Sequence, residues 1–287
     1  MRSAQDARAR PNEVEDFQMK DDNIPCATKR SCTKRSIRRY GWIPDLPDRR
    51  DVRYSAPVSH LTAAPPSTDL RSSCPPVYDQ GDLGSCTANA IAGAFEFDLI
   101  LENLNDFVPS RLFIYYNERV IENTFNTDSG AALRDGIKTI SQQGVCPEAL
   151  YPYVVANFAD TPPAGDYTEA LNNKALQYMS VAQDLDQMRG CLASGFPFVY
   201  GFSVYSSFES PAVATTGVVP MPGPDESIIG GHAVVAVGYD DSAQTFLVRN
   251  SWGSDWGMAG YFTMPYAYLT DPNLASDFWT IRLVSEG

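Results

Sequence analysis

The sequence predicts an α+β fold with two lobes, the first helical and the second rich in β-strands. Apolar residues follow helical spacing between residues 86 and 143. From residue 196 onward, runs of Val, Phe and Tyr alternate with turn residues. Helices and strands segregated along a chain in this way are typical of α+β proteins. We therefore expect a cleft in which a cysteine from the helical half faces a histidine from the β-rich half.

The chain begins with a polar, basic stretch ahead of an acidic body. Residues 1–40 hold ten basic and six acidic residues, a net charge of +4, while the remainder carries −17 and the whole chain −13. Opposite charges favour attraction between this arm and the body, and a solvated, disordered tail is the alternative. Because the acidic body would repel phosphates, we expect no nucleic-acid partner.

The sequence shows neither a membrane span nor a secretory signal peptide. It holds no run of about 18 apolar residues, so we expect no membrane partner. The N-terminal stretch lacks the apolar region of a signal peptide. The compartment therefore stays open: the protein remains inside the cell, leaves it by another route, or has a signal that this sequence omits.

Residues 41–57 are predicted to be extended, since each of their prolines disfavours helix at the preceding residue. Trp42, Ile43 and Leu46 are the apolar residues expected to anchor this stretch. A second Pro-rich run, at 63–76, indicates entry into the folded body. We accordingly divide the chain into an N-terminal region, residues 1–61, and a folded domain, residues 62–287.

Three helices and four strands follow from periodicity. The helices are expected at 86–103, with Ser85 as N-cap, at 109–122, and at 130–143, where Gly144 ends the helix. One or two short helices are expected within 169–192, beside the apolar run YMSVA. A long loop is expected at 205–231. The expected strands are FPFVYGFSVY (196–205), HAVVAVGYDD (232–241), TFLVRNSWG (245–253) and GYFTMPY (260–266).

Cys86, His232 and Asn250 are the candidate reacting groups. The chain has only two histidines, and Asn250 follows His232 by eighteen residues. A thiol, an imidazole and an amide are the parts of a nucleophilic cysteine enzyme, and a helix start stabilises a thiolate. The alternatives are an inert buried cysteine, a core histidine and a turn amide. Gly81 and Gly84, which suit a tight turn before the helix, favour the reactive interpretation.

The other cysteines leave disulfide connectivity open. Cys26 and Cys32 are close enough in sequence for a small loop, and Cys74 and Cys146 are a second possible pair. Metal-dependent hydrolysis is not expected, because two histidines without a CxxC or HExxH pattern supply no ligand cluster. We expect no metal and no cofactor.

Three blocks of sequence resemble the papain/cathepsin-like cysteine peptidases, in particular their bacterial branch. QGDLGSC, which ends at Cys86, resembles the family's Gln-Gly-x-Cys-Gly-Ser-Cys-Trp, and HAVVAVGY resembles its histidine block. NSWGSDWG, from Asn250, resembles its asparagine block, and the likeness extends from about Thr68 to the C-terminus. The resemblance implies a papain-like fold with a helical left lobe and a β-rich right lobe. It makes residues 62–287 a peptidase domain and 1–61 an inhibitory region like a pro-segment.

The resemblance also implies a role for each matching residue. Cys86 would attack the scissile carbonyl, and His232 would activate the thiol and then protonate the leaving amine. Asn250 would hold the imidazole ring. Gln80 would donate to the oxyanion together with the backbone N–H of Cys86. Two tryptophans would support the site: Trp252 would cover the histidine–asparagine bond, and Trp256 would line the leaving-group side, with core packing as the alternative for both.

Substrate contacts are implied by position. Asp128-Ser129-Gly130 resembles the family's Asn-Gly-Gly segment, whose backbone pairs with an extended substrate. Small walls would suit a large apolar side chain, whereas Asp277, if it points inward, would favour a basic one. The expected substrate-binding residues are Ser129 and Gly130, Ala131 and Ala132 beside the main pocket, Ser276 at its floor, Gly231 and Ala233 beside the histidine, and Trp256.

This chain departs from the family pattern at two positions beside the nucleophile. Leu83 stands where the family has a disulfide cysteine, and Thr87 stands in place of the tryptophan after the nucleophile. Neither change removes a reacting group. The family's long helical pro-domain pattern is also missing from residues 1–60.

The leading hypothesis is a cysteine endopeptidase that acts on protein or peptide substrates through a thiolate and an acyl-enzyme. The N-terminal region from about Lys20 to Asp51 would lie along the cleft and keep the enzyme latent. In that arrangement the Cys26–Cys32 loop stiffens the arm, while Trp42 and Ile43 dock on the body. The alternatives are an acyl-transfer (transpeptidase-like) enzyme on the same triad, and a catalytically dead binding module.

Overall fold

The computed structural model describes residues 40–284, so the basic arm and the proposed Cys26–Cys32 loop lie outside the described residues. Residues 58–284 form eight α-helices, two short 3-10 helices and seven strands among the described residues. The α-helices are α1 (Val58–Thr62), α2 (Cys86–Leu101), α3 (Arg111–Ile121), α4 (Leu133–Gln142), α5 (Ala164–Ala170), α6 (Leu185–Ala193), α7 (Pro211–Thr216) and α8 (Tyr266–Thr270). The strands are β1 (Ser67–Asp69), β2 (Ala175–Ser180), β3 (Phe198–Tyr205), β4 (Ile228–Asp240), β5 (Thr245–Arg249), β6 (Tyr261–Pro265) and β7 (Ala275–Val284).

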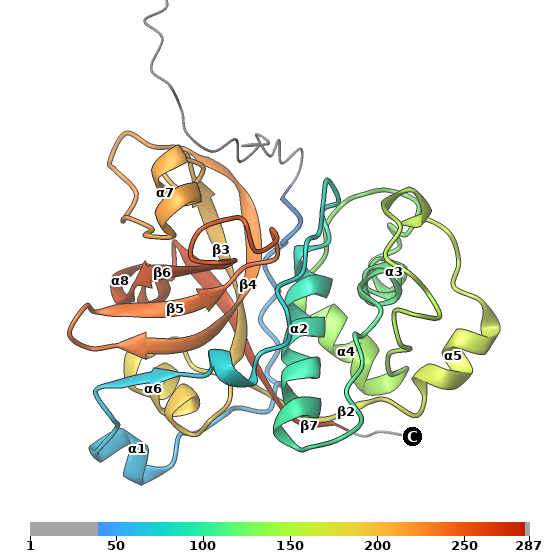
Figure 1. Ribbon diagram of the computed structural model, residues 1–287, viewed down its shortest axis with the longest axis horizontal. Helices are drawn as coiled ribbons and strands as arrows, with labels where there is room; N and C mark the ends of the chain where they lie inside the picture. Colours follow the sequence, from blue (N-terminus) through green and yellow to red (C-terminus); the bar gives the residue numbers. More distant parts are fainter. Residues whose placement is uncertain (1–39, 285–287) are drawn as a thin grey trace, which may run out of the picture. The chain divides into compact units, whose positions relative to one another are not determined.

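The predicted α+β class is confirmed, with helices and strands gathered into two groups. The strands form one antiparallel sheet in the order β2-β7-β3-β4-β5-β6, and β1 pairs with the C-terminal end of β4. Helices α3, α4 and α5 lie on one side of α2, and strands β3 to β6 lie on the other (Figure 1). α2 packs against β4, so it forms the wall between the two groups.

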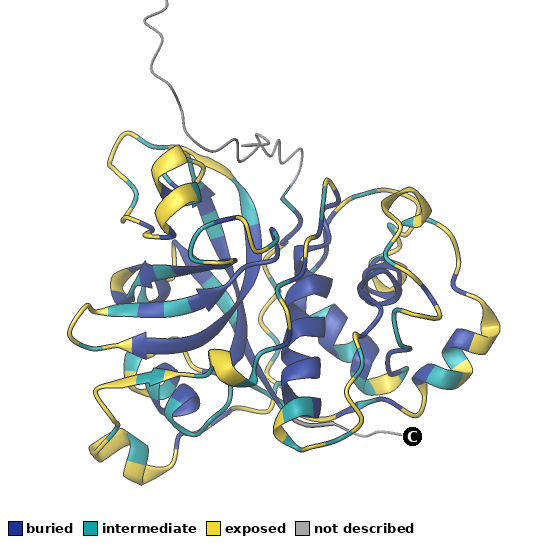
Figure 2. Ribbon diagram, viewed as in Figure 1, coloured by how far each residue is buried: buried dark blue, intermediate teal, exposed yellow. Residues whose placement is uncertain are grey.

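α2 is buried on all sides, and most of its residues are small or apolar. Its residues from Cys86 to Leu99 are buried, and Ala and Gly residues allow close approach of neighbours. At Gly93, for example, the Arg249 side chain lies within 3.3 Å of where a Cβ would stand. Figure 2 shows α2 and the central strands buried, while α1 and α7 are largely exposed. The nucleophile candidate therefore stands at the start of a buried helix.

The predicted helices and strands are present with small shifts in their ends. The helix predicted at 130–143 begins only at Leu133, because Gly130 has a φ of +76° and Ala132 is extended. The run YMSVA, beside which short helices were predicted, contributes its first three residues to strand β2, between α5 and α6. The predicted loop at 205–231 contains α7. Strand β7 was not predicted at all.

Cys74 and Cys146, a possible pair in the sequence, form no disulfide. The four cysteines of the described residues carry free thiols: Cys74, Cys86, Cys146 and Cys191. Cys74 follows a short 3-10 helix, and its thiol donates to the carbonyl of Leu70. Cys146 is buried behind the start of α3, where its carbonyl accepts from the N–H of Ser110. The two residues therefore belong to different parts of the fold.

No helix within residues 40–284 is both long enough and apolar enough to cross a membrane.

Candidate active site

Cys86 is the first residue of α2 and is fully buried. The loop before it is fixed at both ends: the N–H of Gln80 donates to the carbonyl of Ser251 (2.9 Å), and the Gln80 side-chain amide donates to the carbonyl of Leu83 (2.9 Å). Ser85 occupies the N-cap position but does not cap the helix with its side chain. Its hydroxyl instead lies 2.5 Å from that of Tyr153, which corrects the prediction.

His232 and Asn250 come from neighbouring strands and meet side by side. Nε2 of His232, on β4, lies 2.8 Å from Oδ1 of Asn250, just after β5. The N–H of Ser251 donates to the same Oδ1 at 2.8 Å, so the amide oxygen is oriented toward the ring. Trp252 stacks on the imidazole with ring centroids 4.9 Å apart, and Trp256 packs edge-on against Trp252 at 5.2 Å. The tryptophan thus covers one face of the imidazole, and the asparagine fixes the orientation of the ring.

The thiol of Cys86 lies beside these groups, in surroundings that favour its neutral form. Burial raises its pKa to about 12, and the buried carboxyl of Glu118 acts in the same direction. Backbone hydrogen bonds from Ala233, Gly41 and Thr87 oppose that rise. Ala233 follows His232 directly, so the thiol and the imidazole belong to one site. The contact with Gly41 shows that the N-terminal region also reaches the sulfur.

Residues 40–53, here called the cleft segment, lie across the site. The N–H of Trp42 donates to the carbonyl of Gly231 (3.0 Å), next to His232. Ala131, before α4, pairs with the segment through both backbone groups: its N–H donates to the carbonyl of Gly41 (2.7 Å), and its carbonyl accepts from Ile43 (3.0 Å). The segment therefore bonds to both lobes at once, and Figure 1 shows it running between α2 and β4.

The side chain of Trp42 fills a pocket made by residues with almost no side chain. A Cβ at Gly201 would lie 1.9 Å from the indole, and one at Gly231 would lie 2.8 Å from it. The indole Nε1 donates to Oδ2 of Asp277 at 3.0 Å. Asp277 is thus a residue of β7 that contacts the occupant of this pocket, and Ser276, the predicted floor residue, pairs with Gly201 beside it.

The predicted anchors Ile43 and Leu46 are wrong. Their exposed fractions are 42% and 83%, because Pro44 and Pro47 keep the chain extended along the surface. Polar contacts anchor this stretch instead. Asp45 donates its N–H to Oδ2 of Asp277 (2.8 Å), and its carboxylate accepts from Nε1 of Trp279 (3.1 Å).

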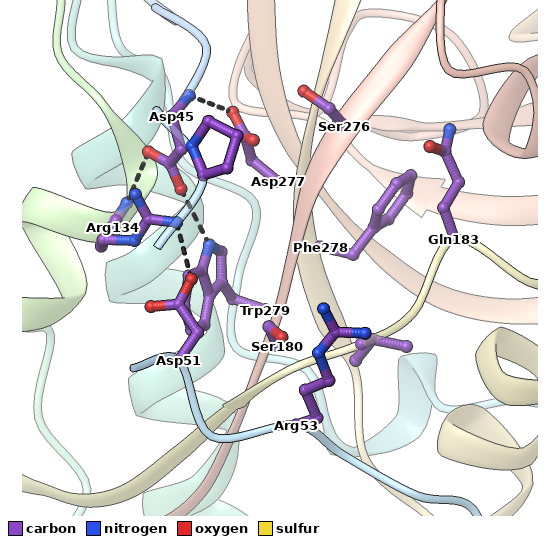
Figure 3. A pocket seen from close by; sticks show the side chains of 12 residues that line it. Asp45, Asp51, Arg53, Arg134, Ser180, Gln183, Ser276, Asp277, Phe278 and Trp279 are labelled. Carbon is purple, nitrogen blue, oxygen red and sulfur yellow. Dashed lines mark hydrogen bonds and ion pairs between the residues drawn. The ribbon is translucent and has the colours of Figure 1, made fainter. Parts of the chain in front are cut away.

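An ion pair and a cavity complete the attachment. Arg134 of α4 pairs with Asp51 at 2.7 Å and donates its N–H to Asp45 at 3.2 Å. Figure 3 shows these groups pointing toward one another beside a cavity of about 400 Å³. Burial, followed by the nearby Asp277, raises the pKa of Asp45 to about 7, and burial raises the pKa of Asp277 as well. Sequence reasoning named Asp277 but not its partners, because nothing local links residues that lie between 83 and 234 positions apart.

The remaining predicted substrate residues fall into two sets. Gly130, Ala131 and Gly231 contact the cleft segment, and a Cβ at Gly130 would lie 2.2 Å from the carbonyl oxygen of Gly41. Ser129 and Ala132 instead bond to the body: the hydroxyl of Ser129 donates within its own loop, and the N–H of Ala132 donates to the side chain of Glu122. Within residues 40–284, no group of three or more His, Cys, Asp or Glu is placed to hold a metal ion.

A buried thiol at a helix start, beside an imidazole held by an amide on an antiparallel sheet, defines a class of cysteine-dependent hydrolases. The family model described as papain family cysteine protease matches residues 64–277. The chain belongs to this family and is a cysteine protease.

Known relatives agree with this assignment. An uncharacterized peptidase-like protein of Acanthamoeba polyphaga mimivirus is 46% identical over 274 residues, which span 87% of this chain and 88% of the relative. Among solved structures, xylellain, a cysteine protease from Xylella fastidiosa, is 45% identical with a TM-score of 0.81, over 88% of this chain and 97% of that chain. Procathepsin L 3 from Tenebrio molitor, at 20% identity, shares the fold with a TM-score of 0.62, over 83% of this chain and 75% of that one.

Proposed function

We propose that this protein is an endopeptidase that hydrolyses peptide bonds through the thiolate of Cys86 and is held latent by the cleft segment. The observation that carries the proposal is the position of the segment. It pairs through its backbone with Ala131 and Gly231 and contacts the sulfur of a cysteine that is fully buried beneath it. A peptide substrate needs the same backbone groups and the same sulfur, so segment and substrate would compete.

Catalysis would begin when the segment leaves and water reaches the site. Exposure removes the main cause of the raised pKa of Cys86, so the thiol can transfer its proton to His232. The thiolate attacks the peptide carbonyl, and His232 then gives its proton to the leaving amine. Water attacks the resulting thioester, with His232 as the base, and the free acid departs. Asn250 keeps the ring in one orientation through both steps.

The negative oxygen formed in each step would be stabilised by the backbone N–H of Cys86 and the amide of Gln80. That amide has two N–H donors, and the bond to Leu83 uses one of them. Its oxygen accepts from the hydroxyl of Ser251 at 2.7 Å, which fixes which end of the amide carries the donors. A donor fixed in advance in this way stabilises the transition state without reorganisation.

The pocket occupied by Trp42 would receive a substrate side chain. Gly201 and Gly231 leave room for a large ring, and Asp277 offers an acceptor at its far end. We propose that this pocket favours large side chains that carry a donor or a positive charge at the tip, because a carboxylate without such a partner would lose its hydrogen bond on burial.

A full-length variant, Gly41→Val, tests latency without truncation. A Cβ at Gly41 would lie 1.6 Å from the carbonyl oxygen of Gly84, so the segment cannot dock, while the folded body is untouched. Leu46→Ser, on the exposed part of the same segment, is the matched control. Hydrolysis of fluorogenic peptides and labelling of Cys86 by a thiol-reactive epoxide are followed together by mass spectrometry.

Gly41→Val should cleave peptides and take up label at least about tenfold faster than the wild type and Leu46→Ser, since both events need the covered sulfur. Equal rates in all three proteins would disprove latency. Labelling without cleavage would indicate a binding module. Peptide transfer to an added amine in preference to water would favour the acyl-transfer alternative.

A further inference from the structure

One carboxylate joins the loop that carries the nucleophile to the edge on which a peptide would pair. Oδ1 and Oδ2 of Asp128 accept from the backbone N–H of Gly84 at 3.0 and 3.3 Å. Gly84 lies two residues before Cys86. Asp128 lies two residues before Gly130, where the pairing stretch Gly130–Ala131 begins. The contact therefore spans 44 residues of sequence between two parts of one reaction site.

Tyr115, on α3, ties the same carboxylate to the pairing stretch. Its hydroxyl donates to Oδ1 of Asp128 at 2.5 Å and accepts from the N–H of Gly130 at 3.1 Å. The phenol is fully buried, and the hydrogen bond to Asp128 adds to burial in raising its pKa, which keeps it a donor. The chain of contacts thus runs from Gly84 through Asp128 and Tyr115 to Gly130.

The loop that presents Asp128 is itself held from below. Arg119 donates to the carbonyls of Phe125 (2.7 Å) and Thr127 (2.9 Å), and its guanidinium lies 4.0 Å from the centre of the Tyr115 ring. A side chain supported in this way is fixed before substrate arrives, so little motion is left at Asp128.

The contact between these two loops matters because both contribute groups to one reaction. The Gly84 side carries the nucleophile and the oxyanion donors, and the Gly130–Ala131 side fixes the peptide. A shift of about 1 Å between them costs as much as 100-fold in rate. A disulfide at the position of Leu83, which the family pattern has and this chain lacks, would brace the same loop covalently.

We propose that Asp128 and Tyr115 are positioning residues that hold the nucleophile loop and the substrate-pairing stretch in register, in place of the missing disulfide. Their role lies in hydrogen bonding rather than charge. A side chain with a carbonyl oxygen at position 128 can accept from both Gly84 and Tyr115, whether or not it is ionised. The inference rests on the proposed peptidase activity and adds residues that the catalytic motif does not contain.

The test uses the full chain carrying Gly41→Val, so that the site is open. In this background, Asp128→Ala should lower kcat/KM for a peptide about 10- to 100-fold, because the two loops lose their link. Alkylation of Cys86 by iodoacetamide should change by less than about twofold, since that small reagent needs neither the oxyanion donors nor the pairing stretch. Asp128→Asn should stay within about threefold of the background, since it keeps the accepting oxygen.

Two further variants complete the design. Tyr115→Phe should raise KM more than it lowers kcat, because the N–H of Gly130, on the peptide side, loses its acceptor. If Asp128→Ala does not fold, Tyr115→Phe alone tests the inference. Asp82→Ala, on an exposed residue of the nucleophile loop, is the control and should match the background.

The possible results separate cleanly. Unchanged cleavage in Asp128→Ala, or, should that variant not fold, in Tyr115→Phe, would overturn the inference. An Asn variant as slow as the Ala variant would do the same, since charge would then be the cause. Parallel loss of cleavage, alkylation and thermal stability would indicate a general structural role and also overturn it. If the Gly41→Val background cleaves no peptide at all, the proposed function itself fails.

Discussion

Cys86 lies in surroundings that would make it unreactive, and the same contacts explain how it could become reactive. Burial is the largest cause of its raised pKa, and under the proposed mechanism release of the cleft segment would remove part of that burial. The imidazole beside it is already oriented by Asn250 and covered by Trp252. We therefore expect the change from latent to active enzyme to be chiefly one of access to the thiol.

The reacting residues can be tested one at a time in the Gly41→Val chain. Cys86→Ala should abolish peptide hydrolysis and leave the fold intact, because it removes only a thiol at the start of a buried helix. Asn250→Ala should retain activity at a level about 10- to 100-fold lower, since it frees the ring without removing a reacting group. Full activity in Cys86→Ala would contradict the mechanism. Thermal unfolding checks that the Cys86→Ala and Asn250→Ala variants are folded.

The pH dependence of the open enzyme should reflect the Cys86–His232 pair. Two coupled groups lose their protons in two steps, so kcat/KM should trace a bell, rising as the ion pair forms and falling as the imidazolium is lost. The profile is measured between about pH 4 and pH 9 with one peptide. A flat profile over that range would argue against an ion-pair nucleophile.

A buried acid behind the nucleophile occupies the space beside one glycine, Gly136. Glu118 is fully buried, burial raises its pKa well above the usual value, and it accepts from the hydroxyl of Thr87 at 2.8 Å. A Cβ at Gly136, on α4, would lie 2.1 Å from Oε1 of this carboxyl and 2.4 Å from Cδ1 of Ile91. Gly136→Ala should therefore destabilise the protein by about 1–3 kcal/mol in a denaturant titration. Unchanged stability would show that the core accommodates the methyl group.

At the scale of elements, docking of the cleft segment should depend on pH. Asp45 on the segment faces Asp277 on the body, with Arg134 and Asp51 beside them, and the docked pKa of Asp45 is raised to about 7. A released Asp45 ionises near its ordinary value, about 4, so the docked state binds more protons. Docking is therefore at full strength below about pH 4 and weakens as the pH rises toward about 7.

We expect weaker docking at higher pH to appear as faster labelling of Cys86 in the wild type than in Asp45→Asn. The ratio of the two rates cancels the ordinary reactivity of the thiol, and it should rise by at least about tenfold between pH 5 and pH 7. The Asn variant, which cannot ionise, serves as the reference at every pH. A ratio that stays constant would mean that Asp45 does not govern docking.

The elements that the sequence predicted well are those whose signal is local. Helical spacing places α2, α3 and α4 correctly, and the three motif blocks place the thiol, imidazole and amide on elements that the fold brings together. Strand β7 escaped prediction because apolar and polar residues alternate only over Trp279–Leu283, half of its length. Its neighbours β2 and β3, rather than its own pattern, make it a strand.

The unpredicted parts of the site share a physical cause. The contacts Asp45–Asp277 and Gly84–Asp128 join residues 232 and 44 positions apart, and neither residue of a pair carries a mark of its partner. Trp42, by contrast, was recognisable as an anchor from its size and its place in a polar stretch. Sequence alone identified what could react, and the fold was needed to show what covers and aligns it.

At the scale of the whole molecule, the first described residues belong partly to the body. Tyr54 and Ala56 are buried, the N–H of Tyr54 donates to Ser180 at 2.8 Å, and that of Ala56 donates to Gln187 at 2.9 Å. The division of the chain after residue 61 is therefore best tested with two shortened chains. One begins before Tyr54 and keeps both buried residues, and the other begins after Ala56 and lacks them.

A chain that begins at Thr62 should unfold at a temperature about 5–10 °C below one that begins at Asp51, because it lacks Tyr54 and Ala56 from the core. Both lack Trp42 and should have an accessible Cys86. Differential scanning calorimetry measures the first property and epoxide labelling the second. Equal melting temperatures would place the boundary of the stable domain at residue 62.

Covalent attachment gives the three backbone bonds of Gly41, Trp42 and Ile43 a strength that they would lack as a separate peptide. A tethered segment acts at an effective concentration in the millimolar range, so even weak pairing keeps the site filled. The stretch around Leu46, which is 83% exposed, is where an external protease could reach the chain. One cut there would separate the cleft segment from the body, and the segment would then have to bind as a free peptide at low concentration. Loss of the cleft segment would then be irreversible, and no later change of pH would restore it.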